Sequence, residues 1–260
     1  MRRAFVAVCA LIAAAALTYT AVLRWLEPAA PTTTTLDGRP LASAEQPGPT
    51  VPQSDDASGY DVSYPQCRRS LPPAPVGFAI VGLNNGKPLS GNPCFAQQWR
   101  WAKRHQDTAV YINTADPGKG TPEEYGGRIA ADTLARLAKH GVPAGTPVWL
   151  DIEASNTWMS AQRATRVINE TMRVLTQAGH PVGLYAAPLH WFEITLNAVV
   201  DVPIWLPMGR YPSVKAGVAA ARLACGEVAF GDRAPDLVQF TTKAHGRVLD
   251  HNLRCPAPAA

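Results

Sequence analysis

The sequence has few of the side-chain clusters that metal sites need. Its six histidines are scattered, and it contains neither a Cys-x-x-Cys pair nor a local Cys/His cluster. Because zinc sites draw their ligands from such clusters, we predict that the chain holds no metal ion. We also expect no organic cofactor.

An excess of positive charge is nearly absent as well. The formal net charge is +4, and Arg2, Arg3 and Arg24 account for three of these charges, which leaves +1 for all later residues. A domain that binds nucleic acid usually carries a strongly basic face. The composition therefore argues against nucleic acid as a partner.

Residues 5–23 contain no charged side chain at all, and they lie between Arg3 and Arg24. About 20 apolar residues suffice to span a bilayer, whereas the apolar part of a cleaved signal peptide is usually about 7 to 15 residues long. We therefore predict that residues 1–26 are a membrane anchor, with a cleaved signal segment and a secreted protein as the alternative. The preceding arginines should keep the N-terminus inside, so that the rest of the chain is extracytoplasmic.

Residues 27–57 lack apolar periodicity and are rich in Pro, Thr, Ser, Ala and Gly. Such a composition is typical of a flexible linker. Residues 58–260 remain for one folded domain, which we expect to be monomeric, and the 47% of hydrophobic residues in the chain allow a sizeable core.

Four cysteines follow the apolar segment, namely Cys67, Cys94, Cys225 and Cys255. An even number of cysteines in an exported chain favours disulfides. Four cysteines allow three pairings. We favour the sequential one, Cys67 with Cys94 and Cys225 with Cys255, which closes two moderate loops.

The most informative stretch is residues 147–153, an apolar run that ends in two carboxylates. In a strand, Asp151 and Glu153 would point to one side and Ile152 to the other. A strand that is apolar on both faces belongs in a covered parallel sheet, and ligands meet such sheets at the carboxyl ends of the strands. We interpret the two acids as a candidate acid/base site, with a helix N-terminus as the structural alternative.

The rest of the chain alternates between strand and helix patterns. We predict helices over 95–105, 122–140 and 160–177, and strands over 59–64, 76–83, 108–112, 147–152, 182–186, 202–206, 236–241 and 247–250. Eight strands of this kind favour an α/β fold, an irregular (β/α) TIM-like barrel with a helix-poor C-terminal half. Only residues 242–246 separate the last two strands, so this pair should be an antiparallel hairpin.

Several predicted strands end in polar residues that a barrel would gather around one mouth. These are Asp61, Asn113, Tyr185, Asp250 and Asn252. Trp158 and Trp205 lie close to the same ends, where flat apolar faces beside carboxylates suit a sugar ring. Core packing is the alternative for these aromatics. Asn84 and Asn85, at the end of the second strand, are read as turn formers.

Six short motifs, in this order, resemble those of the glycoside hydrolase family 25 lysozymes. They cover roughly residues 60–255 and are Asp61-Val62-Ser63-x-x-Gln66, Asp151-x-Glu153, Leu184-Tyr185-Ala186, Ile204-Trp205-Leu206, Val238-Gln239-Phe240 and Asp250-x-Asn252. The resemblance implies an irregular β/α barrel that cleaves the β-1,4 bond after N-acetylmuramic acid in peptidoglycan. Peptidoglycan or a related cell-wall glycan is therefore the expected partner.

The resemblance also implies roles for single residues. Glu153 would be the general acid, Asp151 its partner carboxylate, and Asp61 and Asp250 would flank the sugar. A negative Asp151 nearby would favour the protonated state that Glu153 needs. Asp151 itself could act as nucleophile or orient the acetamide of the substrate. The substrate-binding residues would be Tyr185, Trp205, Asn113, Gln239, Asn252 and Trp158.

Three segments depart from the family pattern. The second strand ends in Asn84-Asn85-Gly86-Lys87, the third ends in Tyr111-Ile112-Asn113-Thr114 where the family usually has a Tyr-His pair, and residues 207–236 look like an insertion that could cover the mouth. A non-catalytic barrel that binds cell-wall glycan is therefore the alternative function, and a structural envelope protein is a third reading.

Overall fold

The computed structural model describes residues 57–73, 76–244 and 246–256. The predicted anchor at residues 5–23 and the linker up to residue 56 lie outside the described residues. Within the described part of the chain, no helix is both long and apolar enough to cross a bilayer.

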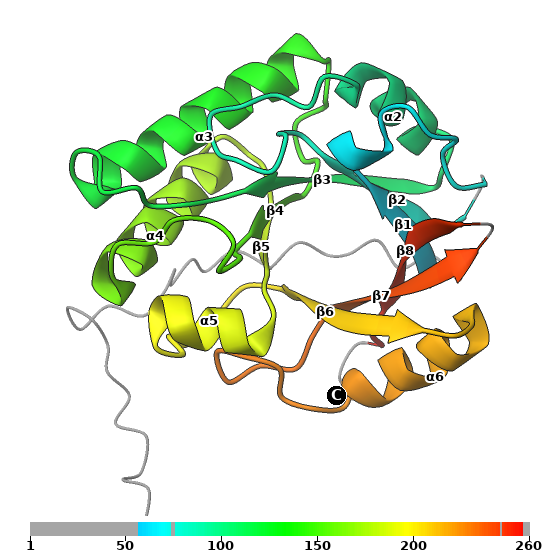
Figure 1. The fold of residues 1–260 in the computed structure, drawn as a ribbon. Helices are drawn as coiled ribbons and strands as arrows, with labels where there is room; N and C mark the ends of the chain where they lie inside the picture. The colour runs from blue at the N-terminus through cyan, green and yellow to red at the C-terminus, as the bar shows by residue number, and fades with distance from the viewer. Residues whose placement is uncertain (1–56, 74–75, 245, 257–260) are drawn as a thin grey trace, which may run out of the picture. The chain divides into compact units, whose positions relative to one another are not determined.

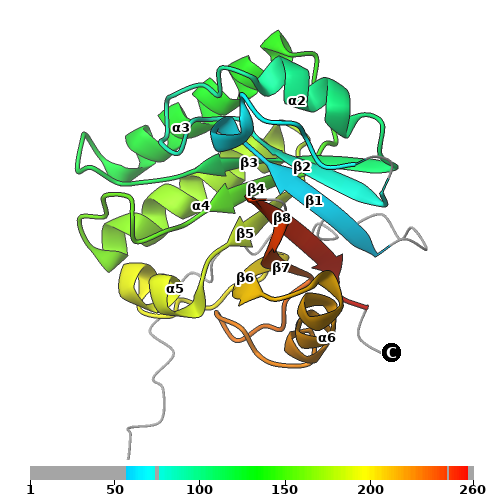
Figure 2. The ribbon, with the colours of Figure 1, turned by 45° about the vertical axis from the view of Figure 1, so that its right-hand side comes forward.

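The described residues form a closed barrel of eight strands that follow one another in chain order (Figures 1 and 2). The first seven strands are parallel, and the last runs antiparallel to both of its neighbours, which confirms the predicted hairpin. The strands are β1 (Ser58–Val62), β2 (Phe78–Gly82), β3 (Asp107–Asn113), β4 (Val148–Asp151), β5 (Val182–Tyr185), β6 (Ile204–Tyr211), β7 (Leu237–Ala244) and β8 (Arg247–Arg254).

Helices cover the outside of the barrel unevenly (Figure 1). Helices α3 and α4 pack side by side along the first half, α2 packs on β2, and α6 packs on the last three strands. The described helices are η2 (Tyr64–Gln66, a 3-10 turn), α2 (Phe95–Ala102), α3 (Pro122–Lys139), α4 (Ala161–Gln177), α5 (Pro188–Thr195) and α6 (Val214–Ala224).

Residues 207–236 were predicted to be an insertion, but they continue the barrel wall. Residues 207–211 extend β6, and α6 follows with Ser213 as its N-cap. The buried face of α6 packs through Ala221 against Val238 and Phe240 of β7. The segment therefore belongs to the fold.

The interior of the barrel is filled by large side chains at its N-terminal end. Phe78, Ile80, Trp149, Trp205 and Leu237 form this cluster. Two inward-facing glycines make room for the rings, because a Cβ at Gly59 would lie 2.5 Å from the Phe78 ring and one at Gly183 would lie 2.4 Å from the Trp149 ring. This end of the barrel is therefore a packed core.

One step further along the strands, the inward positions become polar. Side chains repeat on one face every second residue, so the position after Trp149 on β4 is Asp151, and the position after Leu237 on β7 is Gln239. Neighbouring strands place Asn113 beside Asp151 and Asp61 opposite Asp250. The alternation of side chains along the strands therefore brings acidic residues to the C-terminal end of the barrel interior.

Both predicted disulfides are confirmed, and each has a Cα–Cα distance of 5.4 Å. Cys67 and Cys94 join the residue after η2 to the residue before α2. Cys225 and Cys255 join the end of α6 to the residue after β8. One bond thus restrains segments at the C-terminal end of the barrel, and the other restrains segments at the N-terminal end.

Candidate active site

A cleft of about 340 Å³ opens at the C-terminal ends of the parallel strands. Four carboxylates face it, and no described residue that lines it is a lysine, an arginine or a histidine. The lining residues are Asp61, Ser63, Tyr64, Pro65, Gln66, Gly86, Tyr111, Asn113, Asp151, Glu153, Ser155, Tyr185, Trp205, Gln239 and Asp250. We call this group the carboxylate cleft.

Asp61 and Asp250 are directly opposite each other on β1 and β8. Asp61 Oδ2 accepts hydrogen bonds from Gln239 Nε2 at 2.9 Å and from Asn252 Nδ2 at 2.7 Å. Burial raises the pKa of Asp61 to about 6, against the effect of these amide donors. Burial and the charge of Asp61 raise the pKa of Asp250 to about 7. Asp61, with two donors, is therefore the member of the pair that ionises more readily.

Asp151 is the deepest carboxylate of the β4 end and is 6% exposed. Its Oδ2 accepts a hydrogen bond from Asn113 Nδ2, whereas its buried Oδ1 has no partner among the described residues. Burial, followed by the charges of Glu153 and Asp61, raises the pKa of Asp151 well above its usual range. One oxygen of this buried carboxyl thus has no hydrogen-bond donor among the described residues.

Asn113 is itself held in place by a buried amide. Asn84 Nδ2 donates to the main-chain oxygen of Asn113 at 3.0 Å, and Asn84 Oδ1 accepts from the Asn113 N–H at 3.1 Å. Asn84, which the sequence suggested as a turn former, is 4% exposed and supports the residue that binds Asp151.

Glu153 does not lie on β4 as predicted, because the strand ends at Asp151. It is half-buried in the following loop, where Ser155 Oγ donates to its Oε2 at 3.3 Å. The indole Nε1 of Trp158 donates to the main-chain oxygen of Glu153 at 2.9 Å. Asp151 thus comes from the rigid sheet, whereas a loop carries Glu153.

Aromatic side chains make up the floor of the cleft. The rings of Tyr185 and Trp205 are 4.7 Å apart and edge-to-face. Tyr185 donates from its hydroxyl to Gln239 Oε1 at 3.0 Å, and Trp205 Nε1 donates to Asn252 Oδ1 at 2.8 Å. Since both amides also donate to Asp61, the floor and this carboxylate form one hydrogen-bonded network. Burial raises the pKa of Tyr185 well above its usual range, so its hydroxyl stays neutral.

Most of the residues proposed from the sequence line the cleft, but two do not. Asn252 is 2% exposed and lies beneath Asp61, and Trp158 contacts the main chain of Glu153 from outside the lining. Ser63 and Tyr111 also line the cleft, although neither was predicted to do so from the sequence. The spacing in the sequence could have identified them. Ser63 lies two residues after Asp61 and Tyr111 lies two residues before Asn113, so in an extended chain each shares a face with a proposed site residue.

Comparison with solved structures shows which proteins share this fold. A muramidase from Trichobolus zukalii is 17% identical with a TM-score of 0.53, and the match covers 78% of this chain and 95% of that one. A family GH25 lysozyme from Aspergillus fumigatus is 15% identical with a TM-score of 0.54, over 77% and 94%. A family 25 glycosyl hydrolase from Bacillus anthracis is 16% identical with a TM-score of 0.54, over 84% and 96%.

No family model matches the sequence, and no curated protein matches it. The likeness to the family 25 structures is therefore a likeness of fold, and it confirms the fold that the six motifs implied.

Proposed function

We propose that the domain is a cell-envelope glycoside hydrolase that cleaves the β-1,4 bond between N-acetylmuramic acid and N-acetylglucosamine in peptidoglycan. The observation that carries this proposal is the carboxylate cleft, with four acids, an aromatic floor and no cation among its described lining residues. Glycoside hydrolysis passes through a positively charged, oxocarbenium-like transition state, which such a cleft stabilises. A phosphorylated substrate would be repelled by the same charges.

In this mechanism Glu153 is the general acid. Its carboxyl lines the cleft from a loop beyond the strand end, where it can reach the leaving oxygen of a sugar polymer. The proton of Glu153 passes to the glycosidic oxygen as the bond from the anomeric carbon to that oxygen breaks. Water adds to the anomeric carbon and passes a proton to a carboxylate of the cleft, and Glu153 regains a proton, which completes hydrolysis.

Asp151 is the partner carboxylate. Asp151 lines the cleft, and its carboxyl can accept a hydrogen bond from the acetamide N–H of an N-acetylated sugar or act as the nucleophile. Asp61 and Asp250 flank the sugar from the opposite side of the barrel, and Asp61, which ionises more readily, adds negative charge beside the developing cation.

The fold and the disulfides support the compartment and the substrate. The solved structures with this fold include muramidases and a lysozyme, and muramidases act on peptidoglycan. The two disulfides favour an oxidising compartment outside the cytoplasm. Anchoring through residues 5–23 would place the domain next to the cell wall.

The product analysis tests this function. Purified protein is incubated with peptidoglycan, new reducing ends are counted, and borohydride reduction followed by mass spectrometry identifies the sugar at each new end. We expect reduced N-acetylmuramic acid. If the protein binds peptidoglycan but releases no reducing ends at any pH from about 4 to about 8, the hydrolase proposal is wrong and the glycan-binding alternative holds.

A further inference from the structure

Two loops meet beside the carboxylate cleft, and one of them carries Glu153. The loop after β3 contributes Asp116, whose N–H donates to the main-chain oxygen of Thr157 at 2.8 Å in the loop after β4. Asp116 also forms an isolated parallel bridge with Trp158. Because Trp158 donates to the main chain of Glu153, a short series of contacts joins Asp116 to the proposed general acid.

The side chain of Asp116 is fully buried and is paired by one arginine. Arg163, in the first turn of α4, donates from Nε to Oδ2 at 2.8 Å and from Nη2 to Oδ1 at 3.1 Å. The Gly118 N–H donates to the same Oδ1 at 3.0 Å. A buried carboxylate that loses its cation costs several kcal/mol, so the loop would open sooner than keep an unpaired charge inside.

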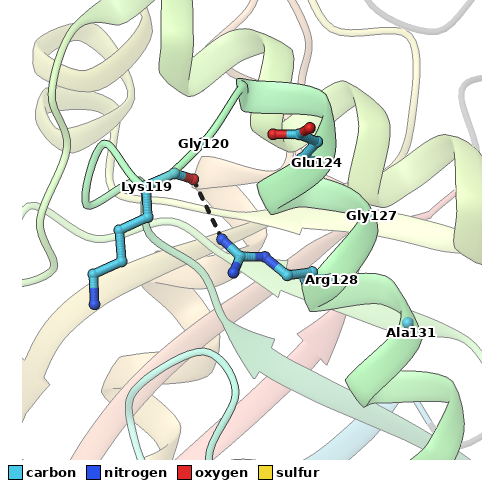
Figure 3. A pocket seen from close by; sticks show the side chains of 6 residues that line it. All are labelled: Lys119, Gly120, Glu124, Gly127, Arg128 and Ala131. Carbon is cyan, nitrogen blue, oxygen red and sulfur yellow. Dashed lines mark hydrogen bonds between the residues drawn. The ribbon is translucent and has the colours of Figure 1, made fainter.

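The loop after β3 is also tethered on its other side. Arg163 Nη2 donates to the Gly120 oxygen at 3.2 Å, while Arg128 Nη2 donates to the Lys119 oxygen at 3.3 Å (Figure 3). Figure 3 shows this second bond at a surface hollow of about 520 Å³ between the loop and α3. Helices α3 and α4 thus hold the loop from two directions.

We propose that Asp116 and Arg163 are positioning residues for the hydrolysis. Their ion pair fixes the loop against which Trp158 packs, and Trp158 in turn fixes the main chain of Glu153 and the place of its carboxyl in the cleft. This inference rests on the proposed role of Glu153. A displacement of about 1 Å at a catalytic group can lower a rate by about 10²-fold, so a loose loop should be visible in kcat.

The chain contains a matched control pair. On α3, Arg136 and Asp132 have the same two-bond geometry, with Nε to Oδ2 at 2.7 Å and Nη2 to Oδ1 at 2.9 Å. Both side chains are partly exposed and neither lines the carboxylate cleft. Arg136→Met therefore removes an ion pair of the same bonding geometry without touching the loops after β3 and β4, since the Arg136 guanidinium lies against Gly91 in the loop after β2.

The experiment compares Arg163→Met, Arg163→Lys, Trp158→Phe and Arg136→Met in the full-length protein. Hydrolysis of solubilised glycan strands gives kcat and KM, and amide hydrogen exchange followed by mass spectrometry reports on residues 153–160. We expect Arg163→Met to lower kcat about 10-fold or more, with a smaller change in KM and faster exchange in this loop. Arg163→Lys, which keeps the charge but not the two-pronged geometry, should fall between Arg163→Met and the parent.

Trp158→Phe removes the indole donor together with part of the ring that packs against the core, and it should lower kcat while exchange near Asp116 stays slow. It therefore tests the same contacts if Arg163→Met does not fold. Arg136→Met should match the parent in both measurements. Parent-like kcat in Arg163→Met and Trp158→Phe, or parent-like exchange over residues 153–160 in Arg163→Met, would overturn the proposal. An inactive parent would refute the function instead, and the exchange data would still test the contact between the loops.

Discussion

The two ends of the barrel use the same inward-facing positions for opposite purposes. At the N-terminal end, Trp149 and Leu237 pack tightly, and the ion pair there joins Arg254 Nη2 to Asp107 at 2.9 Å. At the C-terminal end, carboxylates are buried without a cation among the described lining residues. Burial of the apolar cluster stabilises the barrel, and this offsets the cost of burying carboxyls at the other end, where burial raises their pKa values.

The largest expected effect comes from the packed end. Trp149→Ala should destabilise the domain by about 3 to 5 kcal/mol, because it empties the centre of the interior cluster. Asp151→Asn, one inward position further along β4, should leave stability at pH 7 unchanged or higher, because it removes a buried carboxyl whose pKa is raised by burial. Denaturant unfolding of both variants checks this contrast, and equal losses would refute it.

The two disulfides allow the two ends of the barrel to be compared directly, because they close loops of nearly equal length. They close separations of 27 and 30 residues, so replacing either pair by alanine should cost about 3 to 4 kcal/mol on the chain-entropy model. Only the Cys67–Cys94 pair restrains η2, which contributes Tyr64 and Gln66 to the cleft. Below the unfolding temperature, that double variant should lose more activity than the Cys225–Cys255 one. A larger loss of activity in the Cys225–Cys255 double variant would contradict the assignment of activity to the C-terminal end of the barrel.

A further effect, on the order of several kcal/mol at about 1.4 kcal/mol per pKa unit, should appear in the pH dependence of stability. The folded-state pKa values of Asp61 and Asp250, about 6 and about 7, lie above the ordinary value of 3.8. The folded state therefore binds more protons than the unfolded state in this range, and stability should fall as pH rises from about 4 to about 7. Thermal unfolding measures this slope.

Asp250→Asn should make that slope shallower, because it removes one of the three buried carboxyls whose pKa is raised, Asp61, Asp151 and Asp250. Trp149→Phe, at the packed end, should lower the unfolding temperature at every pH and leave the slope as in the parent. A slope as steep in Asp250→Asn as in the parent would show that Asp250 does not contribute to the proton uptake.

The features that were predicted best from the sequence depend on residues that lie close together in the chain. Alternation along β4 placed Trp149 and Asp151 on one face, and the closing hairpin followed from a loop too short for a crossover. The disulfide pairing also followed from chain order. These properties depend on local geometry, and a single sequence contains that information.

The features that sequence did not predict depend on contacts between distant segments. Glu153 leaves the strand because β4 ends its pairing at Asp151, opposite Asn113 and Tyr185, which are far away in the chain. Trp158 was expected at the sugar, but the loop after β3 draws it to the main chain of Glu153. The helix over residues 214–224 was missed although Ser213 is a good N-cap, because its apolar side consists largely of small alanines.

The central claim is that Glu153 donates the proton, and Glu153→Gln tests it most directly. The amide keeps the shape and much of the hydrogen bonding of the side chain but cannot supply a proton. Release of reducing ends and retention on insoluble peptidoglycan should be measured on the same preparations of parent and variant. We predict that hydrolysis falls by about 10²-fold or more while retention is unchanged. A variant that releases reducing ends at the parent rate would contradict the claim.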